Sequence, residues 1–126
     1  MRVLATSIAA TLIAGCAAPP SPPGPPVAQE TAARVPGPAQ ACISTNPQQN
    51  LHAIDASTLA YGSGRTIFIN RLGAACPGIT PTSTLIVEPG TPGDYCRGDV
   101  VRGREIGASI PGPACVLSAW VPYRAP

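Results

Sequence analysis

Three side chains that could carry out nucleophilic chemistry lie close together in the sequence: His52, Asp55 and Ser57. Such residues form a hydrolytic triad only when the fold gives them the right geometry, and closeness in sequence does not ensure it. Alternate residues of a strand point to opposite faces, and the chain contains no Gly-x-Ser-x-Gly elbow. We therefore interpret His52, the single histidine, as a residue at the solvent edge of the domain and predict no catalytic residue.

Two carboxylates, Asp94 and Asp99, flank Cys96, and Glu105 follows them. Paired carboxylates can serve acid–base chemistry or bind Ca²⁺, but no Asp-x-Asp-x-Asp-Gly loop is present. Asp99 follows Gly98 at the start of an expected strand, so we expect its carboxylate to accept backbone amides in a turn. The sequence predicts no metal site and no cofactor.

Three arginines, Arg97, Arg102 and Arg104, form a local cluster of positive charge. Strand alternation places Arg102 and Arg104 on one face. Guanidinium groups recognise carboxylates and phosphates, so this cluster is a possible partner surface for an acidic protein or for lipopolysaccharide phosphate. The alternative is an ordinary solvated face. Nucleic acid is excluded as a partner, because the net charge is only +2 and five aromatic residues are too few for a base-stacking platform.

Four cysteines fall within the expected domain: Cys42, Cys76, Cys96 and Cys115. Their spacings of 34, 20 and 19 residues do not suit a structural zinc site, which favours close cysteine pairs. An even number of cysteines in a small exported domain indicates two disulfides. Three connectivities are possible, and we favour the nested pairs Cys42–Cys115 and Cys76–Cys96, which would join the ends of the domain and close its middle loop.

The first sixteen residues combine a positive start at Arg2 with an uncharged apolar run that ends in Ile13-Ala14-Gly15-Cys16. The run is too short to span a bilayer and is typical of a secretory signal. Its end resembles the lipobox of bacterial lipoproteins. That resemblance implies a signal peptide over residues 1–15 and a Cys16 that carries diacylglycerol and an N-acyl chain such as palmitate. The alternative is an ordinary secretory signal that is cleaved near Ala17.

Two or more acyl chains hold a protein stably on a membrane. In the lipoprotein class an Asp after the lipidated cysteine commonly retains the protein in the inner membrane, whereas this chain has Ala17. The resemblance therefore implies a lipid-anchored protein on the periplasmic face of the outer membrane.

Residues 17–41 contain eight of the 17 prolines. Proline lacks the amide donor and fixes φ, so we expect neither helix nor sheet here but a semi-rigid polyproline II tether over residues 16–41. Fully extended, 25 residues would span on the order of 75 Å. The alternative is a proline-rich ligand for another protein.

The 126 residues allow one small domain, which we place at residues 42–126. Short runs rich in β-branched and aromatic residues alternate with Gly/Pro turns, and no window has sustained helical periodicity. The pattern predicts an all-β fold, a small disulfide-stapled sandwich or partly open barrel of about six short strands. The expected strands are Leu51–Asp55, Thr58–Tyr61, Arg65–Leu72, Ser83–Glu88, Gly98–Arg104 and Cys115–Val121.

About 80 residues of the chain resemble an uncharacterised family of small four-cysteine exported proteins and lipoproteins of Gram-negative bacteria. The most specific pieces are Cys76-Pro77-Gly78-Ile79 and Cys96-Arg97-Gly98-Asp99-Val100. Family members more often have Leu where Ile79 stands and an aromatic residue near Ile67 or Ile69. The resemblance implies export, disulfides and an all-β fold, and it transfers no active site.

Together these features predict a non-catalytic envelope lipoprotein that binds a periplasmic protein or a cell-envelope component. The alternative is a small periplasmic hydrolase that acts on envelope polymers. A deep cleft that unites His52 with Asp55 or Asp99 would favour the hydrolase, and a shallow strand edge or an arginine-rimmed face would favour the binding protein.

Overall fold

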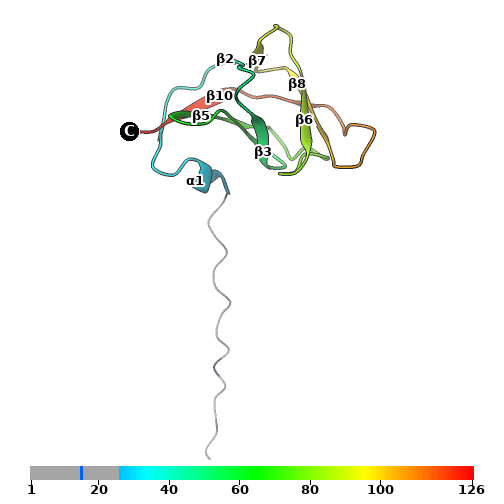
Figure 1. Ribbon diagram of the computed structural model, residues 1–126, viewed down its shortest axis with the longest axis horizontal. Helices are drawn as coiled ribbons and strands as arrows, with labels where there is room; N and C mark the ends of the chain where they lie inside the picture. The colour runs from blue at the N-terminus through cyan, green and yellow to red at the C-terminus, as the bar shows by residue number, and fades with distance from the viewer. Residues whose placement is uncertain (1–14, 16–25) are drawn as a thin grey trace, which may run out of the picture.

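The structure is a computed structural model that describes residue 15 and residues 26–126 (Figure 1). Strands dominate this part of the chain, and the one helix in it is five residues long. The all-β prediction is confirmed, although the described part holds ten strands rather than about six. The elements are α1 (Pro26–Glu30), β1 (Val35–Pro36), β2 (Cys42–Ser44), β3 (Leu51–Asp55), β4 (Thr58–Tyr61), β5 (Thr66–Arg71), β6 (Thr84–Glu88), β7 (Asp94–Cys96), β8 (Val100–Arg104), β9 (Cys115–Val116) and β10 (Trp120–Arg124).

The strands form three antiparallel sheets that do not close into a barrel. The five-stranded sheet has the order β1-β10-β5-β4-β3, the three-stranded sheet has the order β6-β8-β9, and β2 pairs with β7. The β4–β5 hairpin depends on Gly62 and Gly64, whose φ angles of 101° and 77° lie in the region that favours glycine. The expected Gly62-Ser63-Gly64 hairpin loop is therefore confirmed.

The main core lies between the five-stranded and three-stranded sheets. Trp120, Leu59 and Tyr61 enter it from the five-stranded sheet, and Val101 enters it from β8. Trp120 and Leu59 are fully buried, and burial of a large apolar side chain stabilises a fold by about 1.5–3 kcal/mol. The complete set of buried residues is Ile43, Ala53, Leu59, Tyr61, Leu72, Cys76, Ile79, Val101, Leu117 and Trp120.

The opposite face of the five-stranded sheet is apolar as well. Ile54, Ala60, Ile67 and Ile69 are buried there, and Val27 of α1 packs against them. A sheet that carries apolar residues on both faces needs a cover on each side. The segment that begins with α1 provides that cover, so it belongs to the folded domain.

The prediction of an extended tether over residues 17–41 is therefore wrong for its second half. Gly37 N donates to Pro122 O at 2.7 Å, and Gln40 and Trp120 exchange backbone hydrogen bonds of 2.8 and 2.9 Å. Prolines are tolerated here because β1 is an edge strand, where a missing donor leaves no partner unpaired. Pro26 stands at the first helical position, where a backbone N–H has no partner within the helix, so the donor that proline lacks is not missed. The folded part of the chain thus begins near residue 26 rather than at residue 42.

The expected strand Cys115–Val121 is divided between two sheets. Its first two residues form β9 in the three-stranded sheet, and its last two belong to β10 in the five-stranded sheet. The other five expected strands are present within one or two residues of their predicted bounds. The remaining strands, β1, β2 and β7, have two or three residues and are too short to give a period-2 signal.

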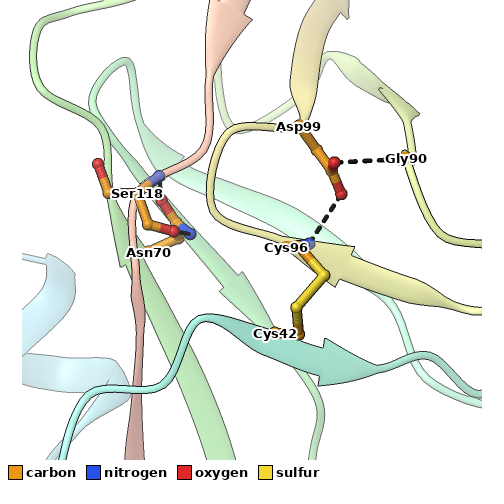
Figure 2. Close-up of a disulfide and its surroundings, with 6 residues drawn as sticks. All are labelled: Cys42, Asn70, Gly90, Cys96, Asp99 and Ser118. Atoms are coloured by element: carbon orange, nitrogen blue, oxygen red, sulfur yellow. Dashed lines mark hydrogen bonds between the residues drawn. A yellow bond between two sulfur atoms is a disulfide. The ribbon is translucent and has the colours of Figure 1, made fainter.

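The two expected disulfides are present, but the nested pairing is wrong. Cys42 is bonded to Cys96, and Cys76 is bonded to Cys115. Figure 2 shows the first bond, which joins residues directly opposite each other in the β2–β7 ladder. In the chain-entropy account, loops of 54 and 39 residues each stabilise the fold by about 4 kcal/mol.

Several predictions about the N-terminal region lie outside the described residues. They concern the signal peptide, the lipidation of Cys16 and the tether over residues 16–25. Within the part that the structure describes, no helix is long and apolar enough to cross a bilayer.

Candidate binding surface

The outer face of the three-stranded sheet carries two of the three predicted arginines. Strand alternation and register place Ile86, Val100, Arg102, Arg104 and Val116 together on it, since Ile86 pairs with Arg102 and Val100 with Val116. We call these five residues the outer face. It combines guanidinium groups with partly exposed apolar side chains, and Val116 is 56% exposed.

Arg102 is held in place on this face. Its Nε lies 3.5 Å from Glu88 Oε1, and its Nη1 donates to Gly112 O at 3.3 Å. Arg104 is exposed, and no carboxylate among the described residues is paired with it. Arg104 is therefore the cation of this face that is available to an anionic partner.

The third predicted residue, Arg97, lies away from that end of the sheet. It belongs to the turn between β7 and β8, whereas Arg104 is the last residue of β8. At about 3.3 Å per residue, the length of β8 alone separates the two by roughly 13 Å. The structure thus places Arg102 and Arg104 together and leaves Arg97 as a separate exposed cation.

The residues proposed for hydrolytic chemistry are not brought together. His52 Nε2 donates to Glu30 Oε1 at 2.9 Å, which fastens β3 to α1. Asp55 instead caps the β3–β4 turn and accepts Ser57 N at 2.8 Å and Ser57 Oγ at 3.1 Å. The interpretation of His52 as an edge residue agrees with its half-buried position.

The electrostatics of Asp55 follow from that turn. Partial burial raises the pKa of its carboxyl, but hydrogen bonds from Ser57 and Thr58 to the carboxylate lower the pKa more in total. The net pKa lies below the ordinary value of 3.8. A carboxylate held ionised by its own turn stabilises structure and is poorly suited to act as a general acid.

Asp99 has the structural role that the sequence predicts. Its Oδ2 accepts Cys96 N at 2.7 Å, and its Oδ1 accepts Gly90 N at 3.1 Å (Figure 2). The carboxylate therefore ties the turn after β7 to the segment after β6. Asp94 lies opposite Ser44 in the short β2–β7 ladder, so the two aspartates that flank Cys96 act in separate local structures.

Shallow hollows with volumes of about 340, 310 and 250 Å³ lie on the described part of the chain. The first runs along β1 and the end of β10, the second lies beside Cys115, and the third lies beside Gly103. None of the three is lined by His52, Asp55 or Asp99. In residues 26–126 no group of three His, Cys, Asp or Glu side chains could hold a metal ion.

Sequence reasoning missed the Glu30–His52 pair and the close packing of Gly78, Gly103 and Gly112. A Cβ on Gly103 would lie 2.2 Å from Gly78 O. The backbone of the Cys76-Pro77-Gly78 turn therefore packs against the backbone of β8 with no room for a side chain between them. The glycine of the Cys-Pro-Gly motif was a visible signal for such a contact. The Glu30–His52 pair has no such signal in the sequence, because the proline content of residues 17–41 predicts a tether there.

Comparison of the chain with known proteins gave no match to a protein family, to a curated protein or to a solved structure.

Proposed function

We propose that this chain is a non-catalytic lipoprotein of the bacterial envelope, anchored through Cys16 on the periplasmic face of the outer membrane. Its β-domain binds an anionic protein or cell-envelope component through the outer face. The resemblance of residues 13–16 to a lipobox supports the anchor. The resemblance of the cysteine-containing motifs to an uncharacterised exported family supports the compartment.

One observation carries the binding role: the side chains proposed for catalysis already hold local structure, whereas Arg104 of the outer face is paired with no carboxylate among the described residues. His52, Asp55 and Asp99 each hold a turn or an element in place. Arg104 remains exposed at one end of this face and Val116 at the other, with the half-buried Ile86 between them. A face that combines a guanidinium with apolar surface has a common composition of protein interfaces.

Site-specific photo-crosslinking in the native envelope tests this proposal. A photoreactive residue at the exposed Thr84, which lies directly opposite Arg104, should give a defined adduct. Arg104→Glu should reduce the yield of that adduct at least about tenfold, because it reverses the charge next to the bound anionic partner. The matched control is Arg65→Glu, which reverses another exposed arginine, in the β4–β5 turn.

Two results would overturn the proposal. One is an adduct yield that falls equally with Arg104→Glu and Arg65→Glu. The other is hydrolysis of a cell-wall or ester substrate by the purified chain that His52→Ala abolishes, since that would make the protein an enzyme.

A further inference from the structure

The segment that follows β8 forms a closed loop with a fixed base. Gly112 N donates to Gly103 O at 2.8 Å, and Arg102 Nη1 donates to Gly112 O at 3.3 Å. Gly103 also packs directly against the backbone of Gly78. Residues 103–112, which we call the β8 loop, therefore leave the domain and return to it at one rigid point, as compact Ω-type loops do.

The outer part of the β8 loop displays apolar side chains to solvent. Ile106 is 83% exposed and Ile110 is 80% exposed, and they are two of the four large hydrophobic residues that are exposed in the described chain. Ile106 stands in a turn that Ala108 N closes on Glu105 O at 3.1 Å, with Gly107 at φ 82°. Isolated exposed apolar residues are ordinary, but two on one short loop need a reason.

The length of chain before α1 limits how far the domain can lie from the lipid anchor. Because residues 26–41 are folded, only residues 16–25 separate Cys16 from the domain. Ten residues span at most about 36 Å, and a domain of about 100 residues is roughly 35 Å across. The anchor therefore keeps every part of the domain surface within reach of the bilayer.

We propose that the β8 loop is a second membrane contact, in which Ile106 and Ile110 insert into the interfacial region of a phospholipid bilayer, between the headgroups and the acyl chains. This inference rests on the lipid anchor of the proposed function. In Figure 1 the loop (orange, at the right) and α1 (at the lower left) lie at opposite sides of the domain. Contacts at both sides would lay the domain along the membrane instead of lifting it away.

The membrane affinity that two isoleucines can supply suits a protein that is already anchored to the bilayer. Burial of one isoleucine favours the membrane by about 10- to 100-fold, which is too little for two residues to recruit a free protein. A lipid anchor raises the effective concentration of the bilayer to the millimolar range or above, so weak insertion becomes the predominant state. Arg104 and Glu105 are adjacent and opposite in charge, so insertion needs no anionic lipid.

Tryptophan quenching in protein-free vesicles tests the inference. The mature lipidated chain, in phosphatidylcholine vesicles with brominated acyl chains, carries Trp in place of Ile110 (I110W) or in place of Ser63 in the exposed β4–β5 turn (S63W). Trp120 is fully buried and gives the same background in both. We expect I110W emission to be quenched at least twofold more than S63W, and Ile106→Asp in the I110W chain to reverse most of the quenching.

The outcomes separate this inference from the proposed function. Failure of the chain to float with the vesicles would overturn the lipid anchor and the loop contact with it. Flotation with equal quenching of I110W and S63W would overturn the loop contact alone, and would mean that Ile106 and Ile110 meet a protein partner or solvent instead of lipid.

Discussion

Asn70 and Ser118 are joined by two hydrogen bonds in opposite directions. Asn70 Nδ2 donates to Ser118 O at 2.7 Å, and Ser118 N donates to Asn70 Oδ1 at 3.0 Å (Figure 2). Ser118 lies between β9 and β10, where the chain passes from one sheet to the other. The fully buried Asn70 amide thus replaces the strand partner that the backbone of Ser118 lacks at this crossover.

Asn70→Ala should leave the backbone N–H and C=O of Ser118 without partners in the interior. We expect a loss of about 2–4 kcal/mol in the free energy of unfolding, because each buried unpaired group costs about 1–3 kcal/mol. Thermal denaturation should show a fall in Tm of roughly 10–20 °C for a domain of this size. Asn50→Ala changes an exposed asparagine and should lower Tm by no more than a few degrees. Equal effects of the two variants would contradict the role given to Asn70.

Gly103→Ala should be among the most disruptive single-methyl changes in the domain. Its Cβ would lie 2.2 Å from Gly78 O and 2.6 Å from Gly78 C. Both are backbone atoms, so no change of side-chain rotamer can relieve the clash. Overpacking of this kind costs about 1–3 kcal/mol or more. Gly73→Ala is the control, since no atom lies within 4 Å of the added Cβ. Chemical denaturation should give a clearly lower midpoint for Gly103→Ala only, and equal midpoints would show that the Gly78 turn does not rest on β8.

The lowered pKa of Asp55 has a consequence for acid stability. A carboxyl whose folded pKa lies below its unfolded pKa stabilises the fold above the unfolded value, near 3.8, and loses that effect as the pH falls through the folded pKa. Asp55→Asn should therefore reduce the stability difference between pH 5 and pH 2. Ser57→Ala should reduce it less, because it removes only the hydroxyl donor and leaves the backbone donor. An unchanged pH profile in Asp55→Asn would contradict the assignment.

The two disulfides should differ in their rate of reduction. Cys42 is exposed, whereas Cys76 is 1% exposed within the main core. A small thiol reductant should reach Cys42–Cys96 first, and alkylation followed by peptide mapping should find these two residues modified before Cys76 and Cys115. Earlier modification of Cys76 would contradict the burial that the fold gives it, and nested cross-linked peptides would contradict the pairing.

The sequence predicted β3, β4, β5, β6 and β8, which have four to six residues, because their alternation and β-branched composition are local signals. It predicted only the first two residues of β10. It could not predict β2 and β7, since a three-residue strand has no period of its own and is defined by its partner. The disulfide pairing depends on that partner, so the error in pairing follows from the missed Cys42–Cys96 ladder position.

The candidate site, like the fold, was predictable only where the signal is local in the sequence. The turn role of Asp99 was predictable because a Gly-Asp pair at the start of a strand is a local signal. The separation of Arg97 from Arg104 was not, because it depends on the register between β6, β8 and β9. Proline content suggested a tether over residues 17–41, yet edge pairing with β10 accommodates Pro36 and Pro38 without loss of a hydrogen bond.

Intact-mass and peptide analysis of the protein extracted from the envelope decides whether this chain is an exported, lipid-anchored protein with two disulfides. We expect a chain that begins at an acylated Cys16, fractionates with the outer membrane, and carries the Cys42–Cys96 and Cys76–Cys115 cross-links. A cytosolic chain that keeps Met1 and has five free thiols would contradict it.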